Sequence, residues 1–150
     1  MSRYVSEALR QVVAARADSL CEYCLIHEED TLLGCQVDHI IGVKHGGLSE
    51  LANLALACAF CNRHKGSNLG SLLRRTGALV RFFNPRLDRW GDHFQLDGAL
   101  IRPASDVGEV TAFIFGFNSG DRVLERKALI AVGRYPTAAA LARMRGSAIP

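Results

Sequence analysis

Four cysteines, arranged as two C-x-x-C pairs, constrain this chain more than any other feature of its sequence. Cys21 and Cys24 form the first pair, and Cys58 and Cys61 form the second. Two such pairs a few dozen residues apart supply four thiolates for one tetrahedral ion, so the spacing predicts a structural Zn2+. The alternatives are two disulfides, a redox dithiol, or iron on the same four sulfurs. A fifth cysteine, Cys35, makes the number odd, and the N-terminal residues do not resemble a secretory signal, which favours a metal over disulfides.

The segment between the two pairs carries further polar residues in a recognisable order. The dipeptide Asp38-His39 is followed by Gly46-Gly47, then by Asn53-Leu54, and the second cysteine pair runs directly into Asn62 and Lys65. This order of DH, a glycine-rich loop, NL and CxxCNxxK resembles the HNH endonuclease family and its ββα-metal motif. The resemblance is close over residues 21–66, and the combination is more specific than any single element of it.

The resemblance implies a role for each matching residue. Asp38 and Asn62 would bind a catalytic Mg2+ or Mn2+, and His39 would be the general base. Asn53 would be the middle Asn of the family name, and Asn62 stands where other members carry His. The chemistry is consistent with these types: histidine can take a proton from water near neutral pH, and a hard cation needs only one or two protein oxygens besides a phosphate.

Each of these residues also has a purely structural interpretation. His39 could be a core histidine, Asn53 could pin the glycine loop through backbone hydrogen bonds, and Lys65 could end a helix instead of contacting phosphate. Asp38 and His39 are neighbours on a predicted strand, so bringing both to one phosphate requires a short or distorted ribbon. A second DH dipeptide, Asp92-His93, lacks flanking ligands and is interpreted as structural.

The hydrophobic pattern predicts an α+β protein: a ββα-metal (HNH/His-Me finger) core with a structural zinc, an N-terminal helix and a C-terminal α+β extension. The expected units are an N-terminal helix within residues 1–20, the nuclease motif at 21–70, and a basic extension at 71–150. Strands are predicted over Leu33–Ile41, Leu54–Ala57, Leu79–Phe83 and Glu109–Phe117, and a hairpin turns at Asp97-Gly98. Helices are predicted from near Cys61 to about Gly66 and from Asp121 to Val132, and the Ala-rich tail, residues 137–145, is open between a helix and a frayed end.

Charge is distributed unevenly along the chain. Residues 1–70 hold 6 Lys/Arg against 8 Asp/Glu, whereas residues 71–150 hold 12 against 7. A nuclease must neutralise phosphates, so we expect nucleic-acid contacts from Lys65, Arg74 and Arg75, with the arginines up to Arg89 bordering a DNA groove. The aromatic residues Phe82, Phe83 and Trp90 lie among these arginines, and they fit a buried core better than a groove.

These observations favour a metal-dependent HNH endonuclease that hydrolyses DNA, with double-stranded DNA preferred over single-stranded DNA as the partner. The alternatives are a zinc-stabilised nucleic-acid-binding module without catalytic activity and a zinc-thiolate redox sensor. No apolar run reaches the roughly 20 residues needed to cross a bilayer, so a cytoplasmic protein without a membrane partner is expected. The sequence leaves open whether the apolar faces of the extension pack within one chain or across a homodimer.

Overall fold

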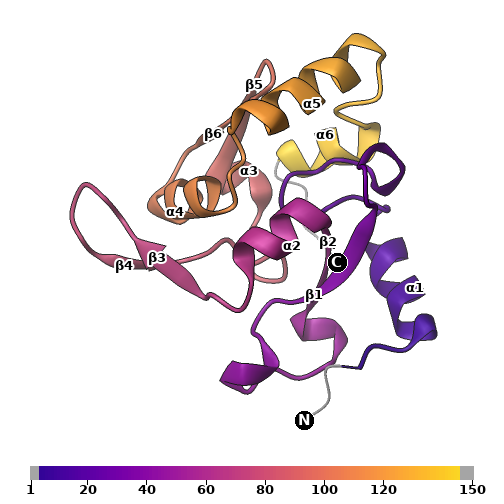
Figure 1. Ribbon diagram of the computed structural model, residues 1–150, viewed down its shortest axis with the longest axis vertical. Coiled ribbons are helices and arrows are strands. Elements are labelled where there is room, and N and C mark those ends of the chain that lie inside the picture. The colour runs from indigo at the N-terminus through magenta and orange to yellow at the C-terminus, as the bar shows by residue number, and fades with distance from the viewer. Residues whose placement is uncertain (1–3, 146–150) are drawn as a thin grey trace.

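Three separate two-stranded antiparallel ribbons organise residues 4–145, which the computed structural model of this protein describes (Figure 1). The strands are β1 (Cys35–His39), β2 (Leu54–Cys58), β3 (Gly70–Leu72), β4 (Leu79–Arg81), β5 (Phe94–Asp97) and β6 (Leu100–Pro103). The α-helices are α1 (Glu7–Arg16), α2 (Ala59–Lys65), α3 (Trp90–His93), α4 (Asp106–Ile114), α5 (Gly120–Ala131) and α6 (Ala138–Met144). Short 3-10 turns are η1 (Glu28–Asp30), η2 (Val43–His45) and η3 (Leu51–Asn53). None of the described helices is long and apolar enough to cross a membrane.

Ribbon β1–β2 and helix α2 form the expected ββα unit. The two strands pair in one register from Cys35 opposite Cys58 to His39 opposite Leu54. Every residue of β2 is buried, since the strand lies between α1 on one side and α2 on the other (Figure 1). Arg16 of α1 donates to the backbone oxygen of Leu54 at 2.6 Å, which fastens the helix to the ribbon. The ββα fold class inferred from the sequence is confirmed.

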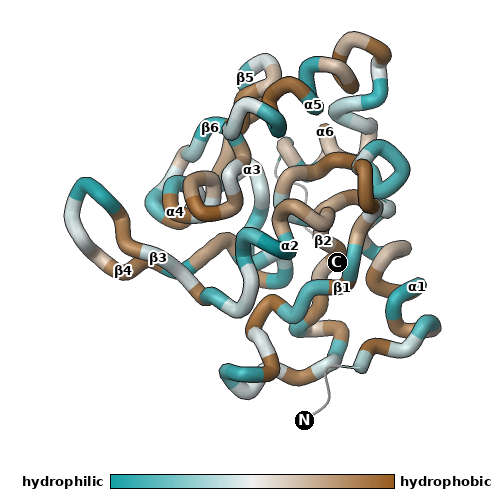
Figure 2. The backbone as a smooth tube through the Cα atoms, in the orientation of Figure 1, coloured by the Kyte–Doolittle hydropathy of each residue, from teal (hydrophilic) through white to brown (hydrophobic). Residues whose placement is uncertain are grey.

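The extension after residue 70 buries an aromatic cluster against this unit. Phe83, Phe94 and Phe117 are almost fully buried, and the indole Nε1 of Trp90 donates to the backbone oxygen of Tyr23 at 2.8 Å. Figure 2 shows hydrophobic stretches where the elements meet and hydrophilic colour at the outer turn of hairpin β3–β4. Buried residues from before and after residue 70 form one continuous core, and the predicted boundary between motif and extension stays a prediction.

The predicted strand over Glu109–Phe117 is wrong, because most of this segment forms α4. Its β-branched and aromatic residues suggested a strand, yet Gly108, Thr111, Ala112 and Phe115 are buried at helical spacing. Ser105 caps the helix, because its hydroxyl accepts from Gly108 N at 3.0 Å. Packing of this face against β3, β4 and β6 outweighs the weak intrinsic preference for a strand.

Other local predictions fared differently. The hairpin at Asp97-Gly98 is confirmed by the pairing of β5 with β6, and the tail forms α6 with Thr137 as its cap. Helix α5 forms as predicted, but its cap is Ser119 and not Asp121, which lies inside the first turn. Strand β3 and helix α3 had no counterpart among the predicted elements, since both are too short to show a periodic pattern.

A buried ion pair joins the first cysteine turn, β2 and the extension. The backbone N–H of Glu22 donates to Leu56 O at 2.8 Å, and its carboxylate accepts from Leu56 N at 2.8 Å. The same carboxylate accepts from the guanidinium of Arg86, which lies between β4 and α3. Because both side chains are nearly inaccessible, removal of one partner leaves an uncompensated charge in the interior.

We therefore expect Arg86→Ala to lower the free energy of unfolding by about 3 to 5 kcal/mol, measured by urea denaturation. Arg102→Ala is the matched control, because its pair with Asp97 is more than half exposed on both sides and is worth at most about 1 kcal/mol. Equal losses in the two variants would contradict a structural role for the Glu22–Arg86 pair.

Candidate metal centre and adjoining pocket

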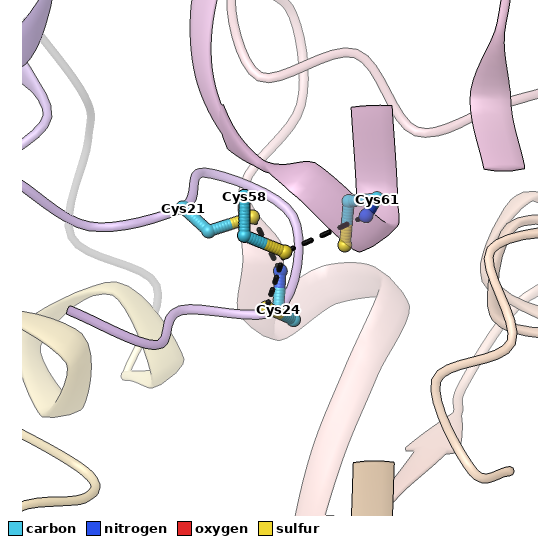
Figure 3. Close-up of side chains that lie close together, drawn as sticks. All are labelled: Cys21, Cys24, Cys58 and Cys61. Atoms are coloured by element: carbon cyan, nitrogen blue, oxygen red, sulfur yellow. Dashed lines mark hydrogen bonds between the residues drawn. The ribbon is translucent and has the colours of Figure 1, made fainter. Parts of the chain in front are cut away.

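The four paired cysteines meet at one point at the start of helix α2 (Figure 3). Cys21 and Cys24 lie in the turn after α1, Cys58 ends β2, and Cys61 lies in the first turn of α2. Their sulfurs all lie within 4.8 Å of one another, and Cys24 Sγ is 3.8 Å from Cys58 Sγ. Four sulfurs about 2.3 Å from a zinc ion stand about 3.8 Å apart, so this spacing fits a tetrahedral site.

The cluster is built for thiolates and not for disulfides. All four thiols are free and fully buried, and the backbone N–H groups of Cys24 and Cys61 point at Cys21 Sγ and Cys58 Sγ, each at 3.5 Å. Burial raises the pKa of the Cys21 and Cys61 thiols, whereas hydrogen bonds from the other cysteines lower the pKa of Cys24. A bound dication is what would hold all four as thiolates. The donor set therefore suits Zn2+.

A pocket of about 430 Å³ opens at the end of ribbon β1–β2. Three of the residues singled out from the sequence line it, although they come from two elements: Asp38 and His39 from β1, and Asn62 from α2. Neighbouring residues of a strand normally face opposite sides, yet Asp38 and His39 both line this pocket. They can do so because β1 ends at His39 and the chain then turns through η2 around the pocket. Lys44 of η2 lines the same pocket.

Asp38 is held in place from two sides. Its carboxylate is only 4 % exposed, accepts from the Tyr23 hydroxyl at 2.7 Å, and lies 3.2 Å from the Lys65 ammonium. Burial raises the pKa of Asp38 above its ordinary value, and the attraction of Lys65 and the Tyr23 hydrogen bond oppose that rise. Tyr23 stays a donor here, because burial and Asp38 raise its own pKa well above its usual range.

Lys65 points into the fold, toward Asp38. The side chain is 2 % exposed, and its Nζ also donates to the backbone oxygen of His39 at 3.0 Å. The ammonium therefore compensates Asp38 and closes the end of β1, and the expected contact of Lys65 with nucleic acid stays a prediction. Helix periodicity placed Lys65 near Asn62, but only the tertiary fold shows that the side chain points inward.

The ring of His39 is fixed through one nitrogen. Its Nε2 lies 2.8 Å from Ser49 Oγ, and its Nδ1 has no hydrogen-bond partner within residues 4–145. Asn62 is oriented in a similar way, because its Nδ2 donates to Gln36 Oε1 at 2.5 Å. The Asn62 amide oxygen accepts no hydrogen bond from the described part of the chain, so it is the free acceptor of this side chain at the pocket.

Asn53 lies outside the pocket and pins the loop that shapes it. Its Oδ1 accepts from Ile41 N at 2.9 Å, and its Nδ2 donates to the backbone oxygens of Ile41 and Leu48. Gly47 packs against the same backbone, and a Cβ at this position would lie 1.7 Å from Ile41 O. Only glycine fits there. These contacts match the structural interpretation of Asn53, and its catalytic role stays a prediction.

The basic residues after α2 are mostly engaged within the chain. Arg74 stacks on the ring of Phe113 at 3.9 Å, and Arg75 pairs with Asp106 at 2.8 Å. Both lie in the exposed turn of hairpin β3–β4, which projects from the body (Figure 1). The three aromatic residues among these arginines are buried in the core: Phe82, Phe83 and Trp90.

The second DH dipeptide is structural, as its interpretation from the sequence expected. His93 Nδ1 lies 2.6 Å from Ser105 Oγ, and Asp92 is an exposed partner of Arg89. Across the described residues, the only group of three or more His, Cys, Asp or Glu side chains that could hold a metal is the four-cysteine cluster. Tyr23, Lys44 and Ser49 are the site residues that sequence reasoning missed, since no spacing rule links them to Asp38 and His39.

Comparison with known proteins agrees with this geometry. Residues 21–68 match the family model described as HNH endonuclease, a segment that begins at the first cysteine and ends just after α2. A search of curated proteins and a search of solved structures gave no match. The matched segment contains all four clustered cysteines as well as Asp38, His39 and Asn62. This part of the chain is therefore an HNH endonuclease domain, of the ββα-metal fold.

Proposed function

We propose that this protein is a metal-dependent endonuclease that hydrolyses phosphodiester bonds in DNA, with His39 activating the attacking water. The observation that carries the proposal is the pocket itself, which gathers a carboxylate, an imidazole and an amide group. A nuclease function in general follows from the HNH domain. The substrate, the catalytic ion and the residue roles are the proposed part.

Asp38 and Asn62 are the residues that would hold a catalytic Mg2+ or Mn2+. A carboxylate offers about four acceptor positions, so Asp38 keeps capacity beyond its bonds to Tyr23 and Lys65. The Asn62 oxygen is uncommitted, and the open pocket leaves room for the waters that such ions retain. When bound, the ion would polarise the phosphoryl oxygen and stabilise the leaving oxygen.

In this proposal, His39 takes a proton from water through Nδ1. The Ser49 hydroxyl accepts from Nε2–H in the tautomer that leaves Nδ1 as the basic nitrogen, and it also stops the ring from rotating. A base needs only to lie within hydrogen-bond reach of the water on the phosphate, and His39 lines the pocket that would receive that phosphate. Ser49 is thus proposed as a positioning residue for the imidazole.

Lys44 is the cation that we assign to substrate phosphate. It is exposed, lines the pocket, and forms no ion pair with any other described residue. By contrast, many arginines of the extension are occupied by carboxylates of the same chain, including Arg75, Arg81 and Arg86. The positive formal charge of the second half is therefore a poor guide to where DNA lies, and the pocket rim is a better one.

A second candidate is favoured by one observation, the close pairing of Asp38 with Lys65. If this ammonium occupies the place of a metal permanently, the domain would be a zinc-stabilised nucleic-acid-binding module without catalytic activity. The two candidates separate on cleavage of supercoiled plasmid with and without Mg2+ or Mn2+. A binding module would retard the plasmid and leave it intact under every metal condition.

The cysteine cluster should be structural, because zinc bound to such sites is worth about 10 to 16 kcal/mol of folding energy in small domains. We expect Cys58→Ser to lose the metal and to lower Tm by roughly 10 °C or more. Cys35→Ala is the control: Cys35 is buried directly opposite Cys58 on β1 but lies outside the cluster. Metal content and thermal unfolding would be measured together, and a metal-free wild type would refute the assignment.

His39→Ala should lower the rate of metal-dependent plasmid cleavage by about 10²- to 10⁴-fold, because the general base is lost. Binding to a labelled duplex, followed by fluorescence anisotropy, should stay within about twofold, since the imidazole contributes little to affinity. His27→Ala serves as the matched control, as His27 caps η1 and does not line the pocket. Cleavage that persists in His39→Ala would remove the proposed base.

Lys44→Ala should weaken duplex binding, because one phosphate contact is lost. The slope of the logarithm of affinity against the logarithm of salt concentration should become shallower by about one. Lys127→Ala is the control, because Lys127 is an exposed lysine of α5 that does not line the pocket. The measurement is a series of anisotropy titrations at increasing NaCl. An unchanged slope for Lys44→Ala would place the phosphates elsewhere.

A further inference from the structure

Helix α5 sends one arginine into the cysteine cluster, although it lies far along the chain from all four cysteines. The Arg122 guanidinium lies 3.2 Å from Cys24 Sγ through Nη2 and 3.8 Å from Cys58 Sγ through both terminal nitrogens. Its Nη1 is 4.0 Å from Cys61 Sγ. Three of the four sulfurs thus have the same guanidinium as a donor.

The Arg122 side chain is buried, and contacts on two sides hold it in place. Arg122 is 2 % exposed, its Nε donates to Glu125 Oε1 at 3.0 Å one turn along α5, and its guanidinium carbon lies 4.9 Å from the ring centre of Phe60. Phe60 stands between the two cysteines of the second pair. The planar group is therefore fixed in orientation by a carboxylate on one edge and an aromatic ring on its face.

The charge of the centre explains why a guanidinium suits this place. Four thiolates around a dication carry a net charge of about −2, and a buried charge is costly unless it is paired and hydrogen-bonded. A guanidinium supplies five N–H donors in a fixed fork, so a single residue can serve several acceptors at once. Arg126, one turn later, is equally buried, yet it donates to the backbone oxygens of Ala99 and Phe117 and to no sulfur.

We infer that Arg122 is a positioning residue of the metal centre, supplied by the extension to a site whose ligands all lie within the HNH domain. Its N–H groups hydrogen-bond to the thiolates, lower their electron density, and slow their loss of metal. Metal retention then depends on the docking of α5, so residues 21–68 do not form a self-sufficient metal module. The inference rests on the proposed metal centre and does not require that the protein cleave DNA.

The test is the rate at which purified full-length variants lose metal to an excess of a chromogenic chelator, with the protein loaded with Zn2+. Arg122→Gln should release the metal about 10- to 100-fold faster than wild type, the usual effect of removing a hydrogen-bonding partner of metal ligands. Arg122→Lys keeps the positive charge but lacks the planar fork of N–H donors, so its release rate should lie between those of wild type and Arg122→Gln. Arg126→Gln changes the same helix at a residue that donates to no sulfur, so it should release metal at close to the wild-type rate. The two Gln variants are compared under conditions in which both have lost the same free energy of unfolding.

A second measurement separates hydrogen bonding from simple packing. In protein loaded with Co2+, the thiolate-to-cobalt charge-transfer band should shift to lower energy in Arg122→Gln, because thiolates without N–H donors are easier to oxidise, and it should not move in Arg126→Gln. Equal release rates for the two variants, or an unmoved band in Arg122→Gln, would overturn the inference. Should Arg122→Gln fail to fold, Arg122→Lys carries the same comparison. A result in which zinc retention depends on Arg122 while plasmid stays uncut would sustain the inference and refute the nuclease.

Discussion

The meeting of four sulfurs fixes the relative positions of the elements that carry the pocket. Cys58 is the last residue of β2 and Cys61 lies in the first turn of α2, so tying both to one point sets the angle between strand and helix. Asn62 follows Cys61 directly, and Asp38 lies on the strand paired with β2. A shift of the cluster would therefore move Asn62 relative to Asp38. The structural centre and the proposed catalytic site are two consequences of the same local geometry.

Every strongly buried acidic group near this centre has a cation that comes from elsewhere in the fold. Asp38 is compensated by Lys65 from α2, Glu22 by Arg86 from the segment before α3, and the cysteine cluster by Arg122 from α5. A buried charge without such a partner would destabilise the fold by several kcal/mol. The basic character of the extension thus reflects the acidic and sulfur groups that it covers, and it says little about DNA.

The features that could be predicted from the sequence are those fixed by local spacing. The cysteine pairs, the strand ending in Asp38-His39 and the hairpin at Asp97-Gly98 each depend on residues close together in the chain. The failures depend on tertiary context. The segment of α4 has the composition of a strand, and its helix depends on packing partners that lie far along the chain. Lys65 and Tyr23 gain their roles only by facing Asp38. No spacing rule could place Arg122 against Cys24, since 98 positions separate them.

The pairing of Asp38 with Lys65 also bears on how a catalytic ion could be held. The Asp38 carboxylate and the Lys65 ammonium lie 3.2 Å apart, and the charges of the pair nearly cancel. By itself the pair would therefore attract a divalent cation only weakly. Asn62 adds an oxygen but no charge. A phosphate in the pocket would supply the missing negative charge, because ions such as Mg2+ are commonly bound by one or two protein groups together with phosphate oxygens. Metal and substrate should then bind cooperatively at this site, which links cleavage to the presence of DNA in the pocket.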